Sequence, residues 1–118
     1  MELQTAVQQL GFSQKEAAVY LAALELGQAT AYQIAKRSGL KKPTAYVVLD
    51  RLVERGAAKK VAAQKHLHYR ALDPVELFVD ARSRMQQVES VLPELRALSQ
   101  QKEKVVQISY FEGMSGIK

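Results

Sequence analysis

The sequence predicts a mainly α-helical fold with one small β-hairpin, and three observations predict it. First, Ser13-Gln-Lys-Glu16 and Thr30-Ala-Tyr-Gln33 each place a hydroxyl three residues before a Glu or Gln, the pattern of a capped helix start. Second, after Gly56 the apolar period shortens to that of strands. Third, a long polar-rich segment from residue 73 carries apolar residues at alternating intervals of three and four.

The N-terminal half is predicted to form four helices. The first covers residues 2–10, and the second runs from Ser13 to Leu26. Two further helices are expected over residues 31–37 and 43–55, with a tight turn between them and Pro43 in the first helical position. In the last helix, one face is apolar and is expected to lie in the core, namely Ala45, Val48, Leu49 and Leu52.

The remaining segments are a hairpin, a long helix and a tail. Residues 57–61 and 66–72 indicate two short strands joined by AAQK. A third capping box, Asp73-Pro-Val-Glu76, begins a helix that runs to about Lys104, and Pro93 is expected to kink or split it. Residues 105–111 have the composition of a strand.

This order of elements indicates a winged helix-turn-helix followed by a long coiled-coil-like helix. We therefore expect three parts. Residues 1–72 form the winged helix-turn-helix, residues 73–104 form a dimerisation helix, and residues 105–118 form a terminal strand and tail.

The composition favours a small soluble protein of the cytoplasm. The chain has 118 residues, 47% of them hydrophobic, so it can bury a core. It contains no cysteine, which excludes disulfides and thiolate zinc sites. The N-terminus lacks the pattern of a secretory signal, and the longest apolar run is too short to span a bilayer.

The positive charge is concentrated in one segment. The net charge is +5, and residues 36–70 alone carry ten Lys or Arg against Asp50 and Glu54. Residues 73–118 are close to neutral, with six basic and seven acidic residues. A basic segment of this kind indicates a polyanionic partner, although a solvated surface would have the same composition.

The segment GLKKPTAYVVLDRLVERG (residues 39–56) gives the most specific indication of function. Lys41 and Lys42 lie at the positive end of the predicted helix dipole, where they weaken the free helix. A DNA phosphate at that end would reverse the unfavourable interaction. Val47 falls on the face opposite the core, where it is either incidental or a contact with a DNA groove.

The motifs S-x-K-E-A-x-V-Y-L-A, I-A-K-R-S-G, Y-x-V-L-x-R-L and Y-R-A follow one another over residues 10–77. In this order they resemble the N-terminal DNA-binding domain of TrmB-type transcriptional regulators. The resemblance implies a winged helix on duplex DNA, followed by a dimerising helix and, in fuller members, an effector-binding domain. The final residues resemble the first strand of that domain, so a small-molecule effector is expected only with a further C-terminal domain. The sequence departs from the family at AAQK, which is short and lacks the usual Gly or Pro, so wing insertion into a minor groove is not expected.

Two sets of functional residues are therefore predicted, one for DNA binding and one for dimerisation. The candidate DNA-binding residues are Tyr32, Gln33, Lys41, Lys42, Pro43, Thr44, Tyr46, Val47, Arg51, Lys60, Lys65, His66, His68 and Arg70. The candidate dimerisation residues form a heptad seam, namely Phe78, Ala81, Met85, Val88, Leu92 and Leu95.

Other classes of function find less support in the residues. No catalytic residue, cofactor or metal site is predicted, because Ser13 and Thr30 are explained as caps and no Gly-rich phosphate loop is present. His66 and His68 could supply two metal ligands, but the sequence offers no third. The main alternative is a winged helix that serves protein–protein assembly without DNA. RNA is less favoured, because no strand displays an aromatic pair for base stacking.

Overall fold

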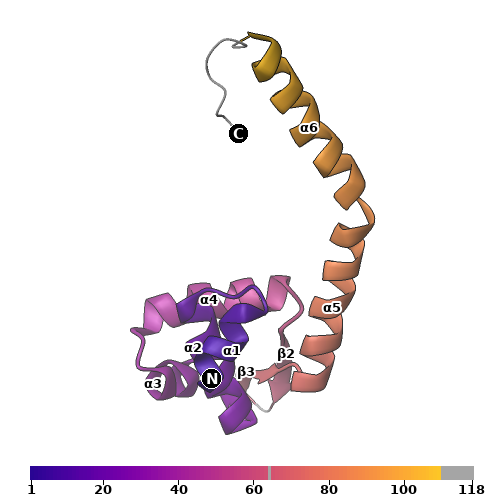
Figure 1. The fold of residues 1–118 in the computed structure, drawn as a ribbon. Coiled ribbons are helices and arrows are strands. Elements are labelled where there is room, and N and C mark those ends of the chain that lie inside the picture. Colours follow the sequence, from indigo (N-terminus) through magenta and orange to yellow (C-terminus); the bar gives the residue numbers. More distant parts are fainter. Residues whose placement is uncertain (64, 110–118) are drawn as a thin grey trace. The chain divides into compact units, whose positions relative to one another are not determined.

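The computed structural model describes residues 1–63 and 65–109. In chain order they form α1 (Leu3–Gln9), α2 (Gln14–Leu26), β1 (Gln28–Thr30), α3 (Ala31–Ser38), α4 (Lys42–Glu54), β2 (Ala58–Ala63), β3 (His66–Ala71), α5 (Pro74–Ser90) and α6 (Leu92–Ser109) (Figure 1). The predicted fold class, mainly helical with a small antiparallel sheet, is confirmed. The chain divides into two units, Met1–Ala81 and Arg82–Lys118.

Two predicted capping boxes set the starts of α2 and α3. The Ser13 hydroxyl accepts a hydrogen bond from the Glu16 N–H at 3.1 Å, and the Glu16 carboxylate accepts one from the Ser13 N–H at 2.8 Å. Thr30 and Gln33 make the same reciprocal pair at 3.2 and 2.9 Å. Both boxes satisfy backbone donors that a helix start leaves open, so both predictions are confirmed.

The core of the first unit is built around α2. This helix packs against α1, α3, α4 and the sheet, and it is buried on several sides because Ala17, Ala22 and Ala23 allow close approach. From α4 the predicted core residues Ala45, Val48, Leu49 and Leu52 are all buried. The first unit continues to Ala81 because Leu77, in the second turn of α5, is buried in the same core.

The predicted hairpin is confirmed, and a third strand joins it. The sheet has the order β1-β3-β2, and both pairings are antiparallel. Tyr69 in β3 lies opposite Ala29 of β1 and Lys60 of β2. The strand β1 was not predicted, because three residues are too few to display a period of two. It forms because β3 offers an open edge beside the start of α3.

The starts of α4 and α5 differ slightly from expectation. Helix α4 begins at Lys42, so Pro43 occupies its second position, where the missing N–H is also harmless. At the start of α5, the Asp73 carboxylate accepts from the Val75 N–H at 2.8 Å. Among the described residues, Glu76 makes no reciprocal bond to Asp73, so this start is capped by Asp73 alone.

Pro93 splits the long helix, as predicted. Helix α5 ends at Ser90 and α6 begins at Leu92. Around the break, the Val91 carbonyl accepts hydrogen bonds from the Glu94 and Leu95 N–H groups, both at 3.1 Å. Pro93 has no N–H, so the regular ladder cannot pass through this position.

The strand expected over residues 105–111 is wrong for residues 105–109, which continue α6 to Ser109. Helix propagation needs only the preceding turn, whereas a strand with β-branched composition still needs a partner strand. Residues 110–118 lie outside the described part. In the described part, no helix is both long and apolar enough to cross a bilayer.

Candidate nucleic-acid interface

Helix α4 separates core residues from solvent-facing residues along two faces. Opposite the buried face lie Pro43, Val47, Asp50, Arg51 and Glu54, all exposed, and half-buried Thr44 lies on the flank. Val47 exposes 52% of its surface, although an apolar side chain gains nothing from water. The face therefore combines an apolar contact point with charges of both signs.

The start of α4 is open and positively charged. Lys41 occupies the capping position, and its side chain makes no capping hydrogen bond. The first backbone donors of the helix therefore lack a side-chain acceptor, next to two exposed ammonium groups. Acceptor atoms of a phosphate would satisfy both kinds of group at once.

Two tyrosine rings flank Lys42. Its Nζ lies 5.4 Å from the centroid of the Tyr32 ring in α3 and 5.8 Å from that of Tyr46 in α4. Lys36 lies one turn along α3 from Tyr32, with its Nζ 5.9 Å from the same ring centroid. The rings remain largely open to solvent, with 56% of Tyr32 and 42% of Tyr46 exposed.

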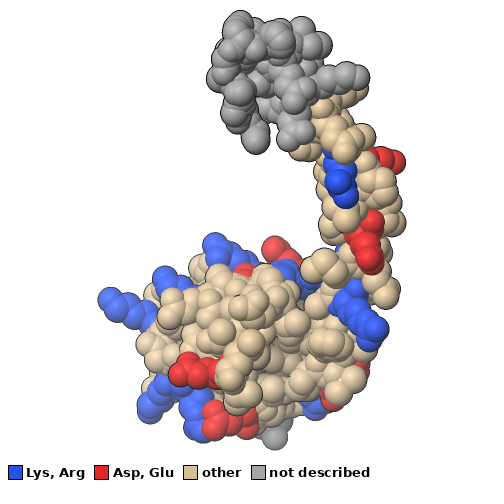
Figure 2. All heavy atoms as spheres, in the orientation of Figure 1, with Lys and Arg blue, Asp and Glu red and all other residues tan. Residues whose placement is uncertain are grey.

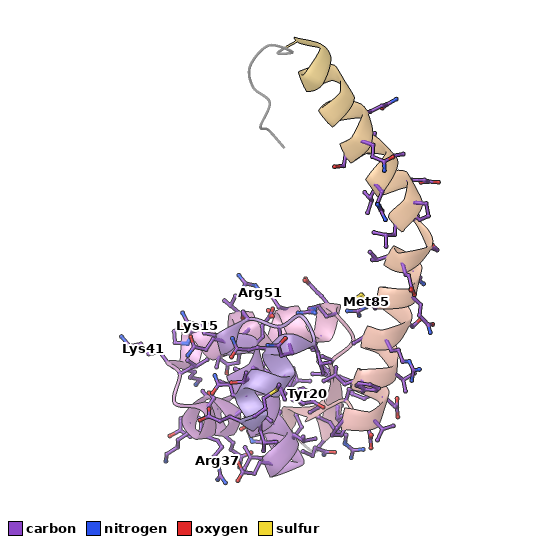
Figure 3. All side chains as sticks on the ribbon, viewed as in Figure 1. Lys15, Tyr20, Arg37, Lys41, Arg51 and Met85 are labelled. Carbon is purple, nitrogen blue, oxygen red and sulfur yellow. The ribbon has the colours of Figure 1, made fainter. Side chains whose placement is uncertain are left out.

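Lys41 and Arg51 both project outward from the α4 side of the first unit, whereas Arg37 lies on the opposite side of the view (Figure 3). Several Lys and Arg side chains also extend from the left edge, where Figure 1 places the turn between α3 and α4 (Figure 2). Arg37 is already engaged, because its Nε donates to Glu25 at 3.2 Å and its Nη2 pairs with the same carboxylate. It is therefore a weaker candidate for phosphate binding than Lys41.

Gln33 has a structural role besides its predicted one. Its side-chain oxygen accepts the Thr30 N–H in the capping box, which leaves its amide NH₂ as the group able to donate to a ligand. Like Tyr32, it lies in the exposed first turn of α3. The structure thus brings the predicted residues of α3 close to those at the start of α4, through the contacts of Tyr32 with Lys42.

The register of the sheet divides the predicted basic residues of the hairpin between two faces. Lys60 lies opposite Tyr69, whose side chain is buried in the core of the first unit. Burial, together with the negative charge of Asp50, raises the pKa of the Tyr69 phenol. Arg70 and His68, one residue to either side of Tyr69, therefore face the other way. The structure does not bring Arg70 and His68 together with Lys60 on one surface.

The outward face of the sheet holds two local contacts. The Arg70 guanidinium donates to the Gln28 side-chain oxygen at 3.0 Å, across the β1–β3 pair. The His68 Nδ1 lies 3.1 Å from the His66 carbonyl oxygen. Within residues 1–63 and 65–109, no three His, Asp or Glu side chains are grouped as a metal would need. Lys65 is exposed in the turn between β2 and β3.

An open groove of about 530 Å³ runs beside this face of the sheet. Its charged lining residues are Lys59, Arg70, Asp73 and Glu76, so the two cations are balanced by two carboxylates. Leu24, Leu72 and Pro74 supply apolar lining. A groove of balanced charge gives a polyanion no net attraction, which separates it from the α4 surface.

The predicted dimerisation seam is exposed along both long helices. In α5, Phe78 exposes 54% and Met85 67% of its surface, and Val88 is similarly exposed. In α6, Leu92 and Leu95 are about half exposed. Ala81 is half-buried. These apolar side chains repeat along the helices with no described residue covering them fully.

Sequence reasoning missed the contact of Lys36 with the candidate residue Tyr32, and the influence of Asp50 on Tyr69. Tyr32 and Lys36 are four residues apart in one helix, a spacing that places side chains together and could have revealed the contact. The influence of Asp50 on the Tyr69 pKa depends on the packing of the sheet against α4, for which the sequence gives no local signal.

Helices α2, α3 and α4 are closed by a small antiparallel sheet, and α4, the second helix of the helix-turn-helix pair, has an exposed face. This arrangement defines a winged helix-turn-helix of the kind found in transcriptional regulators. The comparisons place the chain within this class. Residues 7–75 match the family described as sugar-specific transcriptional regulator TrmB. Because the match covers more than half of the chain, the chain belongs to the TrmB family.

Solved structures share the fold of this chain. TrmBL2, an archaeal chromatin protein described as showing a novel mode of DNA binding, is 25% identical, with a TM-score of 0.68 over 90% of this chain and 41% of its own. The chain thus spans about two fifths of the length of TrmBL2. An ArsR-like regulator from Rhodococcus sp. RHA1 is 14% identical, with a TM-score of 0.56 over 83% of this chain and 90% of its own. The oxidised form of MarR from E. coli is 14% identical, with a TM-score of 0.55 over 88% and 82%. The latter two share the fold alone. Comparison with curated proteins gave no match.

Proposed function

We propose that this chain binds specific sites on double-stranded DNA as a homodimer and thereby regulates transcription in the cytoplasm. One observation carries the proposal. Helix α4 exposes Lys41 and Lys42 at its start, and further along it exposes Val47 and Arg51 opposite its buried face. Phosphate contacts position a protein on DNA, and contacts to base edges select the sequence. A helix that exposes both kinds of group suits a major groove.

The residues of this face divide into two roles. Lys41 and Lys42 are assigned to phosphates, because they lie beside the open backbone donors of the helix start. Thr44, Val47 and Arg51 are assigned to base edges. Arg51 would donate to guanine acceptors, and Val47 would contact the methyl group of thymine.

The homodimer is proposed to form through the apolar seam of α5 and α6. About half of the surface of Phe78, Val88, Leu92 and Leu95 is exposed, and a second copy of the same seam would cover it. A two-fold pair would present two α4 helices to successive major grooves, ~34 Å apart. Pairing of two half-sites would add to the affinity that a single winged helix supplies.

A mobility-shift titration over a range of salt concentrations tests DNA binding. The titration measures the affinity of the full chain for three ligands: a duplex DNA selected from genomic fragments, a scrambled duplex, and an RNA of equal length. We expect the selected duplex to bind most tightly, and log K to fall linearly with log salt. Equal affinity for the selected and scrambled duplexes would refute sequence specificity. No shift of either duplex at low salt would refute DNA binding and favour an assembly module.

A further inference from the structure

The contact between Lys42 and its two tyrosine neighbours sets this lysine apart from Lys41. The Lys42 Nζ lies within 6 Å of the ring centroids of Tyr32 and Tyr46 at the same time. Among the described residues, Lys41 makes no such contact, although it is the preceding residue and is also exposed. The two lysines that the sequence pairs therefore have different surroundings.

An ammonium group beside an aromatic ring is attracted by the ring's negative face. A lysine side chain has several rotatable bonds, and fixing it on a partner costs conformational entropy. Two rings that already favour one position of Nζ reduce this cost before any ligand arrives. In the part of the chain that the structure describes, Lys41 has no such rings beside it, so it would lose its full side-chain conformational entropy on binding a phosphate.

We propose that Tyr32 and Tyr46 are positioning residues, which hold the Lys42 ammonium where it receives a DNA phosphate. This inference rests on the proposed function. In this role the tyrosines support the phosphate contact of Lys42 and do not contact base edges. Because Tyr32 lies in α3 and Lys42 in α4, the phosphate contact depends on both helices.

Lys36 strengthens the case for a phosphate at this position. Its Nζ is 5.9 Å from the Tyr32 ring, so one ring has two ammonium groups beside it. Two like charges near one ring repel each other in the free protein. A phosphate would relieve that repulsion, whereas an apolar or cationic partner would not.

The positioning role requires the aromatic faces and not the phenol hydroxyls. Phe retains the ring quadrupole, so Tyr32→Phe and Tyr46→Phe should bind DNA like the parent. Leu removes the ring and keeps the helix, so Tyr32→Leu and Tyr46→Leu should each weaken duplex binding by roughly two- to five-fold. A loss in the Phe variants as large as in the Leu variants would overturn the proposal, because the hydroxyl would then bind DNA directly.

A double-mutant cycle separates positioning from direct contact. Tyr32→Leu should weaken binding in the parent and have a clearly smaller effect when Lys42→Ala is already present, with Lys36 left as the cation beside the ring. The matched control is the cycle between Tyr32 and Lys41, in which the two effects should add. Additive effects for Tyr32 with Lys42 would overturn the proposal, since the ring would then act on DNA without the lysine.

A measurement without DNA makes the outcome independent of the proposed function. In the free protein, NMR shifts of the Lys42 side-chain methylene protons should report the rings, and Tyr32→Leu should move them toward random-coil values. The Tyr32→Phe variant should leave them in place. Lys42 shifts that are random-coil in the parent would overturn the inference even if DNA binds. Failure of the parent to bind DNA, with ring-shifted Lys42 protons, would refute the proposed function and leave the lysine–tyrosine contact standing.

Discussion

The Tyr20 hydroxyl donates a 2.6 Å hydrogen bond to the Leu72 carbonyl oxygen and so ties the middle of α2 to the end of β3. Tyr20 is buried, and its ring lies 6.5 Å from that of Phe12. The bond joins residues 52 positions apart at the point where the sheet passes into α5. Tyr20 lies within the helical unit in Figure 3.

Replacing Tyr20 by Phe should lower the free energy of unfolding by about 0.5–1.5 kcal/mol, because it removes this hydrogen bond and keeps the packing. Burial, and next the negative charge of Asp73, raise the pKa of Tyr20 to about 12. The stabilising contribution of the neutral phenol is therefore complete below pH 10, the ordinary pKa of tyrosine, and is lost as the pH rises toward 12.

Urea unfolding of the parent and the Tyr20→Phe variant at pH values from 8 to 11 measures both effects. The difference in stability should be largest at pH 8 and shrink above pH 10, because the unfolded parent gains stability by ionising its phenol. A difference that stays constant up to pH 11 would show that Tyr20 has an ordinary pKa.

A second link joins the start of α2 to the end of α4. The Arg55 Nη1 donates to the Glu16 carboxylate at 3.1 Å, and the Arg55 guanidinium lies 3.9 Å from the centroid of the Phe12 ring. Arg55→Ala should lower the free energy of unfolding by about 1–3 kcal/mol, since it leaves a mostly buried carboxylate without this charged partner. Chemical unfolding measures the loss.

Arg37→Ala is the matched control for Arg55→Ala. It breaks the Arg37–Glu25 pair, in which both side chains are about half exposed, so it should lower the free energy of unfolding clearly less than Arg55→Ala does. Equal losses in the two variants would mean that the burial of Glu16 adds nothing to the strength of its ion pair.

The sequence predicts the local features of this fold but not its long-range contacts. The capping boxes at Ser13 and Thr30, the core face of α4 and the break at Pro93 depend on neighbouring residues, and each was predicted. The bond from Tyr20 to Leu72 and the pairing of β1 with β3 depend on residues about 40 or more positions apart. No local period carries that information.

The same holds for the candidate site, where the sequence predicts local exposure but not the contacts between elements. Exposure of Val47 follows from the helical period, and the structure confirms it. The cluster of Lys42 with Tyr32 requires the crossing of α3 and α4, and the division of Lys60 from Arg70 requires the strand register. Composition places Lys42, Lys60 and Arg70 in one basic segment and does not show that they lie on different surfaces.

The proposed dimer predicts a change of mass when its seam is charged. Met85→Glu/Leu92→Glu places two carboxylates in the seam, where pairing would have to desolvate them, so the protein should sediment as a monomer at tens of micromolar. Gln86→Glu/Gln100→Glu adds the same charge at exposed positions outside the seam and should leave the dimer intact. A parent that is itself monomeric at that concentration would refute the homodimer.

Lys42 and Arg51 should differ in how they affect DNA binding. Lys42→Ala should weaken selected and scrambled duplexes alike and lower the salt slope by about one unit, as expected for one phosphate contact. Arg51→Ala should cost on the order of 1–3 kcal/mol on the selected site alone. Titration of both duplexes at several salt concentrations measures each effect. An equal loss on both duplexes for Arg51→Ala would reassign this side chain to the phosphates.

Val47 gives the most specific test of α4 as the recognition helix. With 52% of its surface exposed, it contributes little to the core, so Val47→Ser should leave the stability of the fold almost unchanged. If Val47 contacts a thymine methyl group, the substitution should relax discrimination at one base position, with little loss on scrambled DNA. Competition between the selected duplex and duplexes altered at single positions measures this discrimination, and replacing the relevant thymine by uracil in the parent complex should reproduce the effect. Unchanged preference at every position would remove Val47 from the recognition surface, while the phosphate contacts of Lys41 and Lys42 would be unaffected.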